Sequence, residues 1–243
     1  MLIKYKIMEN IKIIKSVLND IFDILNNIVN QDFFVDHIYY INLDKRTDRK
    51  LHIEKQIKTN FDFMLKNTTR IPGVIYNDNN NPSNINGAIG CSMAHYNVIQ
   101  DAIKNNYEKI LILEDDFEFI CNKSKFLTDI NYFLNNYKNF DIFLLSFNNC
   151  KSKKINDLVE IVETSLSASG YIISKKAFQS LMNVCTNSTE KLKQTKLIPK
   201  GAFDVLWHDI MRIRKNTYKF NYRIGKQIEG YSDICKKNRN YGV

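Results

Sequence analysis

Residues 110–117 read Ile-Leu-Ile-Leu-Glu-Asp-Asp-Phe, and this stretch decides the fold class. Four apolar residues in a row predict a strand that is buried on both faces, as in a sheet covered by helices. Three consecutive carboxylates, Glu114, Asp115 and Asp116, follow where this strand should end. Open α/β sheets bind ligands at the carboxyl ends of their strands. The stretch therefore predicts an α/β fold with an acidic site at one edge of the sheet.

The acidic triplet itself has two interpretations. Adjacent carboxylates repel one another, and Mg²⁺ or Mn²⁺ would offset this repulsion because both ions prefer carboxylate oxygen ligands. A metal ion held there would bridge to a phosphorylated ligand. The alternative is an acidic strand end followed by a solvated turn, and the triplet alone does not choose between the two.

Strands and helices alternate around the triplet. Residues 35–43 predict the first strand, and a polar turn then opens a helix that ends near Asn60, with Thr47 or Asp48 as its N-cap. Further helices are predicted over 87–105, 123–137, 175–184 and 202–214, further strands over 141–146, 158–164, 168–174 and 218–224, and a loop over 186–200. The strands 158–164 and 168–174 read as a hairpin-like pair. This alternation predicts a mixed, mostly parallel sheet flanked by helices.

Residues 4–30 predict one long amphipathic helix. Ile7, Ile14, Ile21 and Ile28 recur every seven residues, and other apolar residues widen the stripe beyond a coiled-coil seam. Such a face suits packing on the protein's own core or on a second copy of the chain, with binding to a membrane surface as a third option. We expect an N-terminal helical segment over 1–32, which would serve packing or homo-oligomer formation, and one domain over 33–243.

Charge is distributed unevenly along the 243 residues. The net charge is +9, and residues 191–243 hold 13 Lys and Arg against 4 Asp and Glu, so the rest of the chain is neutral. A basic C-terminal quarter suits a nucleotide diphosphate, a nucleic acid or an anionic membrane surface, or it is simply a solubilising surface. Because no recognised nucleic-acid motif occurs, we expect no nucleic-acid partner.

Five scattered cysteines without a CxxC pair argue against a zinc site and against a disulfide framework. A reducing compartment is the simpler expectation. We find no signal peptide and no run of the roughly 20 uncharged residues that a transmembrane helix needs. The expected location is cytoplasmic, and peripheral association with a membrane stays open.

Four blocks in the region from about Val35 to Ile234 resemble glycosyltransferase family 25, which includes bacterial lipooligosaccharide galactosyltransferases and the collagen galactosyltransferase domain. The blocks are 41–49 (Ile-Asn-Leu-Asp-Lys-Arg-Thr-Asp-Arg), 87–95 (Gly-Ala-Ile-Gly-Cys-Ser-Met-Ala-His), 113–116 (Leu-Glu-Asp-Asp) and a looser set at 171–174, Asp204, Gln227 and 232–234. Each block alone is weakly specific, whereas their order and spacing together are strongly specific.

This resemblance implies a GT-A fold, an inverting mechanism and a UDP-sugar donor that carries galactose or glucose. The Glu-Asp-Asp block resembles the DxD motif of metal-dependent GT-A enzymes, which implies Mn²⁺ or Mg²⁺ as the cofactor. The implied acceptor is a glycan, as in lipopolysaccharide biosynthesis, or a hydroxylated protein side chain.

The resemblance also implies roles for single residues. Asp116, helped by Glu114, would hold the metal, and Asp115 would hold the ribose or the metal's water shell. Late metal ligands would come from Asp233 or His208. Asp204 would be the base that an inverting transfer needs, unless it is only a helix N-cap. The other donor-binding candidates are Asn42, Leu43, Arg46, Arg49, Gly90, Cys91 and His95.

Three of these candidates can also be interpreted from the residues alone. Arg46 and Arg49 open a helix directly after a strand, where backbone N–H groups favour an anion, although a solvated helix start looks the same. His95 is a lone histidine on a helix, and such a residue is more often a satisfied core residue, or one that supports a neighbouring ligand, than a catalyst.

Two positions depart from the family pattern. Ala88 stands where the family usually has Glu, and Ala94 stands where it usually has Ser. These departures leave open the alternative that the protein is catalytically inactive and binds a nucleotide sugar or an acceptor. The retained acidic triplet argues against that alternative.

Overall fold

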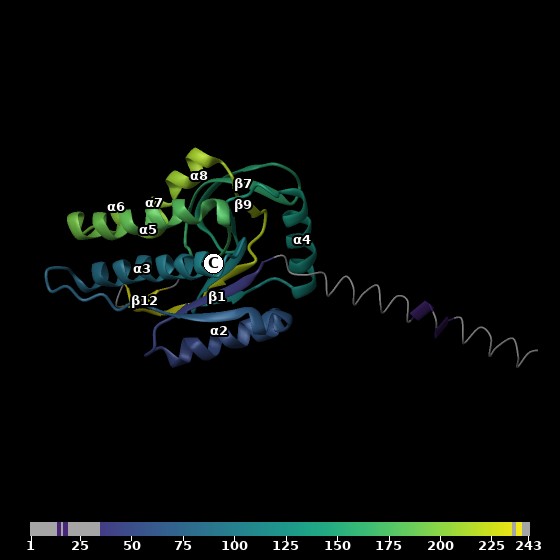
Figure 1. Cartoon of the computed structure of the whole chain (residues 1–243), viewed down its shortest axis with the longest axis horizontal. Coiled ribbons are helices and arrows are strands. Elements are labelled where there is room, and N and C mark those ends of the chain that lie inside the picture. The colour runs from purple at the N-terminus through teal and green to yellow at the C-terminus, as the bar shows by residue number, and fades with distance from the viewer. Residues whose placement is uncertain (1–13, 16, 19–34, 235–236, 240–243) are drawn as a thin grey trace, which may run out of the picture.

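The computed structural model describes residues 14–15, 17–18, 35–234 and 237–239. The helix predicted over 4–30 lies almost wholly outside the described residues, so its packing and any role in oligomers stay predictions. A central sheet lies between helix α2 (Thr47–Asn60) on one side and helices α3 (Ser83–Lys104) and α5 (Lys175–Thr195) on the other (Figure 1). Among the described helices, none combines the length and the apolar character that a membrane crossing requires.

The sheet has eight strands in the order β2-β1-β3-β8-β5-β9-β7-β6. Strand β1 pairs in parallel with β2 and β3, and β5 pairs in parallel with β9, whereas β8 and β7 run against their neighbours. The strands are β1 (His37–Asn42), β2 (Thr68–Pro72), β3 (Lys109–Glu114), β5 (Ile142–Leu144), β6 (Asn148–Lys154), β7 (Val159–Leu166), β8 (Gly170–Ser174) and β9 (Thr217–Phe220). The predicted mixed, mostly parallel sheet is confirmed.

Alternate residues of each central strand feed two separate cores. On β3, Leu111 and Leu113 pack into the core that α2 shares with α4 (Lys123–Asn136). Their neighbours Ile110 and Ile112 pack into the core formed with α3 and α5. Burial on both faces explains why this strand reads as a continuous apolar run, and it fixes where the strand ends and the acidic triplet begins.

Two short ribbons bring the C-terminal part of the chain to the end of β3. Strand β4 (Phe117–Phe119) pairs with β10 (Gly225–Gln227), and β11 (Gly230–Ser232) pairs with β12 (Lys237–Arg239). The backbone N–H of Ile228 donates a 2.8 Å hydrogen bond to the carbonyl of Asp116. The late residues of the family resemblance therefore lie beside the acidic triplet.

The predicted hairpin of 158–164 with 168–174 was wrong. Strand β7 pairs with β6 and β9, and β8 lies between β3 and β5. Strand β6 was not predicted, because its Asn-Asn-Cys-Lys-Ser-Lys-Lys stretch shows no apolar alternation.

The predicted loop over 186–200 was also wrong, because α5 continues to Thr195 and the short helix α6 (Ile198–Gly201) follows it. Ser188 and Leu192 continue the buried stripe of α5. The Ser188 hydroxyl donates a 2.6 Å hydrogen bond to the carbonyl of Gly201, so a polar residue is satisfied within the packed face. Because this buried stripe includes a serine, the sequence showed too little apolar periodicity to predict a helix there.

Helix boundaries differ from the predictions in three places. Helix α3 begins at Ser83, so Gly87 and Gly90 lie inside a helix and not at its start. The predicted helix 202–214 is broken at Trp207 into α7 (Phe203–Leu206) and α8 (His208–Arg214). The N-cap position of α2 is Arg46, which makes no capping hydrogen bond, so neither predicted cap was right.

Candidate functional site

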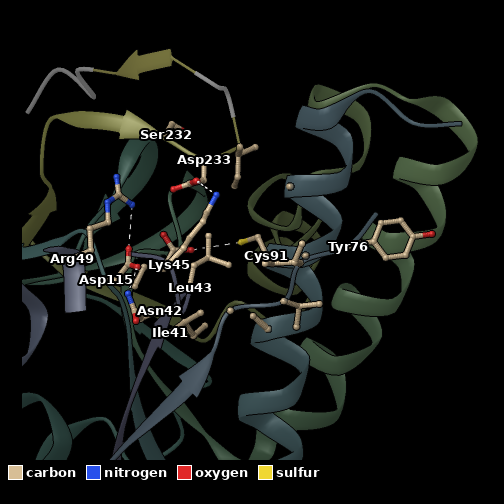
Figure 2. Close-up of a pocket in the computed structure, with 18 of the residues that line it drawn as sticks. Ile41, Asn42, Leu43, Lys45, Arg49, Tyr76, Cys91, Asp115, Ser232 and Asp233 are labelled. Atoms are coloured by element: carbon tan, nitrogen blue, oxygen red, sulfur yellow. Dashed lines mark hydrogen bonds and ion pairs between the residues drawn. The ribbon is translucent and has the colours of Figure 1, made fainter. Parts of the chain in front are cut away.

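A cavity of about 250 Å³ opens where the parallel strands β1, β2 and β3 end, bounded by α3 and by residues 232–234 (Figure 2). Parallel strands end at one edge of the sheet, so this position agrees with the expected crevice. The predicted site residues that line it are Asn42, Leu43, Arg49, Gly90, Cys91, Glu114, Asp115, Asp116 and Asp233. The acidic triplet therefore lies in a cavity and not in a solvated turn.

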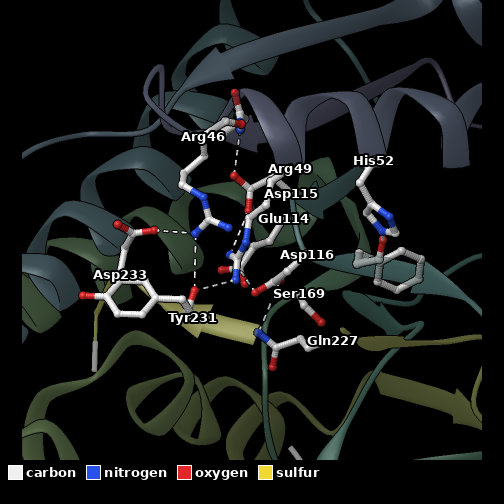
Figure 3. Close-up of polar contacts among 12 residues, drawn as sticks. Arg46, Arg49, His52, Glu114, Asp115, Asp116, Ser169, Gln227, Tyr231 and Asp233 are labelled. Carbon is white, nitrogen blue, oxygen red and sulfur yellow. Dashed lines mark hydrogen bonds and ion pairs between the residues drawn. The ribbon is translucent and has the colours of Figure 1, made fainter. Parts of the chain in front are cut away.

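Asp115 and Asp116 share one guanidinium. Arg49 Nη1 lies 3.1 Å from a carboxylate oxygen of each residue (Figure 3). The amide of Asn42 donates to Asp115 at 2.8 Å. Burial and the charge of Glu114 raise the pKa of Asp116 to about 7, with Arg49 opposing them. One guanidinium therefore compensates the triplet only partly.

Glu114 makes different contacts from its two neighbours. Its Oε1 lies 3.2 Å from Nε2 of His95 and 3.6 Å from Sγ of Cys91. His95 is fully buried, and its Nδ1 lies 2.9 Å from the hydroxyl of Tyr171. His95 therefore lies behind Glu114 and does not line the cavity.

The C-terminal strap, which we define as residues 230–234, is tied across the mouth of the cavity by cations from the start of α2. Arg46 and Lys45 each lie 2.7 Å from a different oxygen of Asp233. The Tyr231 carbonyl accepts from Arg46 at 3.3 Å and from Arg49 at 3.0 Å (Figure 3). Burial alone would raise the pKa of Asp233, but the two cations outweigh it and lower that pKa.

Asp204 lies one side chain behind the cavity wall. Its carboxylate accepts a 3.0 Å hydrogen bond from the backbone N–H of Ser167, whose hydroxyl lies 3.2 Å from Oε1 of the cavity residue Gln227. The alternative reading as a helix N-cap was wrong, since Ala202 occupies that position of α7. Burial raises the pKa of Asp204, with the Ser167 N–H opposing it and the charge of Glu114 adding to it.

His208 is not brought to the acidic triplet. Its Nε2 lies 2.9 Å from the carbonyl oxygen of Ser165, and the residue does not line the cavity. Trp207 Nε1 donates to the same carbonyl at 2.7 Å. We therefore assign His208 to the packing of α8 against β7 and not to the metal.

Segment 73–77 forms one wall of the cavity and was not among the residues predicted for the site. The backbone N–H of Gly73 donates to the carbonyl of Asn42 at 2.9 Å, and Arg70 Nε donates to the Asn42 side-chain oxygen at 3.1 Å. The Arg70 contact holds the Asn42 side-chain oxygen and so leaves the amide nitrogen directed toward Asp115. The Pro72-Gly73 turn after a short strand was the signal that could have located this wall.

The sequence profile of glycosyltransferase family 25 (LPS biosynthesis protein) matches residues 35–196, which is more than half of the chain. The chain belongs to glycosyltransferase family 25. It is 27% identical over 186 residues to the lipooligosaccharide biosynthesis protein lic2B of Haemophilus influenzae, covering 68% of this chain and 70% of that protein. A glycosyltransferase 25 family member of Anopheles gambiae is 26% identical over 125 residues, 43% of this chain but 20% of that longer protein.

A solved structure shows the same fold. The crystal structure of a glycosyltransferase involved in the glycosylation of the major capsid of PBCV-1 matches with a TM-score of 0.52 and 13% identity, covering 82% of this chain and 95% of that one. The fold of this family 25 enzyme is GT-A-like, as the resemblance implied. Its class, a glycosyltransferase, follows from the family.

Proposed function

We propose that this enzyme is a metal-dependent, inverting hexosyltransferase. It moves galactose or glucose from a UDP-sugar to a glycan or to a hydroxylated protein side chain. The observation that carries the proposal is the acidic triplet at the end of β3, which lies inside the cavity with Asn42 and Arg49. Hydrogen-bond donors and carboxylates thus converge at one end of a cavity whose other walls are largely apolar, as in a ligand site.

The donor set fits a hard divalent cation such as Mn²⁺ or Mg²⁺. The high pKa of Asp116, near 7, reflects burial and like-charge repulsion, and a cation would relieve both. Asp116 would hold the ion with Glu114 beside it, and Asp115 would hold the ribose or the ion's water shell. When bound, the ion supplies Lewis-acid stabilisation of the leaving diphosphate. Asp233 is the remaining candidate ligand, since it lines the cavity and His208 does not.

The rest of the cavity suits the other parts of a nucleotide sugar. Arg46 and Arg49 lie at the start of α2, where cations and backbone N–H groups favour phosphate. Gly90 lets the backbone of α3 approach the wall formed by Val74 and its neighbours, and Cys91 lines the cavity beside it. An apolar wall of this kind provides a surface for the flat face of a base or sugar.

Asp204 is the proposed base for the acceptor hydroxyl. A base works best when its pKa approaches the working pH, and burial moves the pKa of Asp204 in that direction. It connects to the cavity through Ser167 and Gln227, whose amide lies 3.5 Å from Asp116. The acceptor would therefore enter on the side of the triplet that faces β7 and β10.

A catalytically inactive binding protein is the second candidate, and it rests on Ala88 and Ala94. Ala88 packs with Ile85 and Leu192 in a small apolar cluster and does not line the cavity. Ala94 lines the cavity. The alternative thus depends on one missing hydroxyl near the site.

Release of UDP from a panel of UDP-sugars, measured with and without Mn²⁺, tests the proposal. We expect Mn²⁺-dependent turnover of one donor, lost in Asp116→Ala and kept in Asp48→Ala, which removes an exposed carboxylate of α2. UDP binding without turnover, even when acceptor sugars are supplied, would favour the inactive binding protein. Absence of both binding and turnover would overturn the choice of a UDP-linked donor.

A further inference from the structure

Three side chains of different chemistry converge on the wall of the cavity. Sγ of Cys91, Nε2 of His95 and a carboxylate oxygen of Glu114 all lie within 4.8 Å of one another. We propose that this Cys91–His95–Glu114 cluster is a second metal site, selective for a thiophilic ion of the Zn²⁺ class. The inference goes beyond the proposed function, because the donor's Mn²⁺ or Mg²⁺ would bind to Asp116.

The distances within the cluster match those around a tetrahedral zinc ion. Zn–S bonds of about 2.3 Å and Zn–N or Zn–O bonds of about 2.0–2.2 Å keep neighbouring ligand atoms roughly 3.3–3.6 Å apart. The observed separations are 3.6 Å from Cys91 Sγ to Glu114 Oε1 and 3.2 Å from His95 Nε2 to the same oxygen. Two of the three separations therefore match a tetrahedral ion as they stand, and the third, between the Cys91 and His95 ligand atoms, is at most 4.8 Å, so rotation of these side chains would bring them around one ion.

Local structure holds two of the ligands in place. Cys91 and His95 are four residues apart on α3, so they lie on one face of the helix, one turn apart. The His95 ring stacks on Phe203 with centroids 4.6 Å apart, and its Nδ1 lies 2.9 Å from the hydroxyl of Tyr171. A second hydrogen bond of this kind is typical of metal-binding histidines, because it directs the other ring nitrogen toward the ion.

Charge and access also favour an ion at the cluster. In the part of the chain that the structure describes, no Lys or Arg forms an ion pair with Glu114, since Arg49 pairs with the other two carboxylates. Cys91 and Glu114 line the cavity, and the Cys91 side chain extends from α3 toward the end of β1 (Figure 2). An ion can thus enter from the cavity and keep a fourth position open toward it.

The mixed ligand set explains why the cysteine pattern argued against zinc. Zinc was not expected because paired cysteines are absent from the sequence. This cluster instead combines one cysteine, a histidine one helical turn later and a glutamate at the end of a strand. An ion there would also draw Glu114 away from Asp116 and fill part of the donor cavity. Zn²⁺ should therefore compete with the donor sugar nucleotide.

Co²⁺ provides a direct probe, because it adopts the same sites as Zn²⁺ and absorbs light. We expect one equivalent of Co²⁺ to give the thiolate-to-cobalt charge-transfer band and the visible bands of a tetrahedral site, and Zn²⁺ to abolish them. Cys91→Ser should remove the charge-transfer band and weaken Zn²⁺ competition about tenfold or more. Cys150→Ser, which changes a cysteine of β6, should leave the spectrum unchanged.

Asp116→Asn separates this inference from the proposed function. It should abolish Mn²⁺-dependent turnover and retain the cobalt bands, since Asp116 is not part of the cluster. A charge-transfer band that survives in Cys91→Ser would overturn the inference, as would the absence of any band in the wild type. His95→Gln, checked for folding by circular dichroism, gives a second test, and tetrahedral bands of full intensity in that variant would also overturn it.

Discussion

The guanidinium of Arg46 lies 2.7 Å from the carboxylate of Asp233, although 187 positions separate the two residues. Both side chains are largely buried, with 17% and 16% of their surface exposed. The pair joins the start of α2 to the C-terminal strap, so the two ends of the family resemblance meet at the mouth of the cavity. An ion pair of this kind fixes the strap in one position over the site.

Loss of this ion pair should weaken donor binding. Asp233→Asn removes the charge that holds both Arg46 and Lys45, so the strap loses its fixed position. We expect UDP affinity, measured by titration calorimetry, to fall about tenfold, which corresponds to about 1.4 kcal/mol.

Asp48→Asn is the matched control for that change. Asp48 also pairs with Arg46, but 66% of its side chain is exposed, and such exposed pairs contribute only about 0–1 kcal/mol. An equal loss of affinity in both variants would mean that the position of the Arg46 guanidinium, which both carboxylates hold, and not the strap determines donor binding.

Arg49→Gln should destabilise the metal-free protein more than the metal-bound one. Arg49 is the cation that compensates Asp115 and Asp116, and removal of one partner from a buried ion pair costs about 3–5 kcal/mol. Divalent cations at the same carboxylates would replace that compensation. Urea unfolding in EDTA and in Mn²⁺ should therefore show a larger stabilisation by Mn²⁺ in Arg49→Gln than in the wild type.

Lys50→Met provides the control on the same helix, because the Lys50 side chain is half-exposed and lies 3.9 Å from Glu54, away from the acidic triplet. Its stability should respond to Mn²⁺ as the wild type does. If Mn²⁺ stabilised Arg49→Gln no more than the wild type, the proposed metal position beside Asp116 would be wrong.

The centre of the site could be predicted because it depends on one strand and its neighbour. Asn42 ends β1 and Glu114 ends β3, and two parallel strands that pair in register must place these ends together. Buried strands are long apolar runs, so their ends are visible in the sequence. One cavity therefore contains the acidic triplet, Asn42 and Arg49, as expected.

The remaining parts depend on contacts between distant segments. The apolar run Tyr171–Ile173 is compatible with either strand direction, and its place between β3 and β5 depends on both partners. The strap reaches the site through the β11–β12 ribbon and the contacts of Asp233. Neither the place of β8 nor that of the strap leaves a periodic signal in the sequence. The contact of Glu114 with Cys91 and His95 leaves none either.

Gly90→Ala should separate α3 from the wall formed by segment 73–77. A Cβ at Gly90 would clash directly with the carbonyl oxygen of Val74, which is backbone and cannot rotate away. Overpacking of this kind costs about 1–3 kcal/mol, and here the displaced wall belongs to the cavity. We expect a lower melting temperature together with weaker UDP binding.

Asn97→Ala, at an exposed position of the same helix, should change the free energy of unfolding by about 0.5 kcal/mol or less. It therefore controls for any general effect of alanine in α3. Unchanged UDP binding in a destabilised Gly90→Ala protein would show that the 73–77 wall does not contact the donor.

Asp204→Asn should change how stability depends on pH. Because burial raises the folded-state pKa of Asp204, the folded protein holds this proton to a higher pH than the unfolded chain does. Stability therefore falls as the pH rises from the unfolded pKa through the folded pKa, and the Asn variant lacks this loss. Relative to the wild type, Asp204→Asn should gain stability as the pH rises above about 4, the unfolded-state pKa of an aspartate, measured by urea unfolding. A difference independent of pH would contradict the raised pKa.

The same raised pKa makes a separate prediction for catalysis. A base must be ionised to accept the proton of the acceptor hydroxyl, so kcat/KM should fall on the acid side with an apparent pKa above the usual range of an aspartate. Asp204→Asn keeps an oxygen that can accept from the Ser167 N–H but cannot take up the proton. We expect kcat to fall about 100-fold or more with UDP binding retained, because general-base catalysis typically contributes 10²–10⁴-fold. If the variant kept its turnover and its acid limb, the base would have to be a carboxylate that lines the cavity itself, and Glu114, which lies close enough to raise the pKa of Asp204, would be the next to replace.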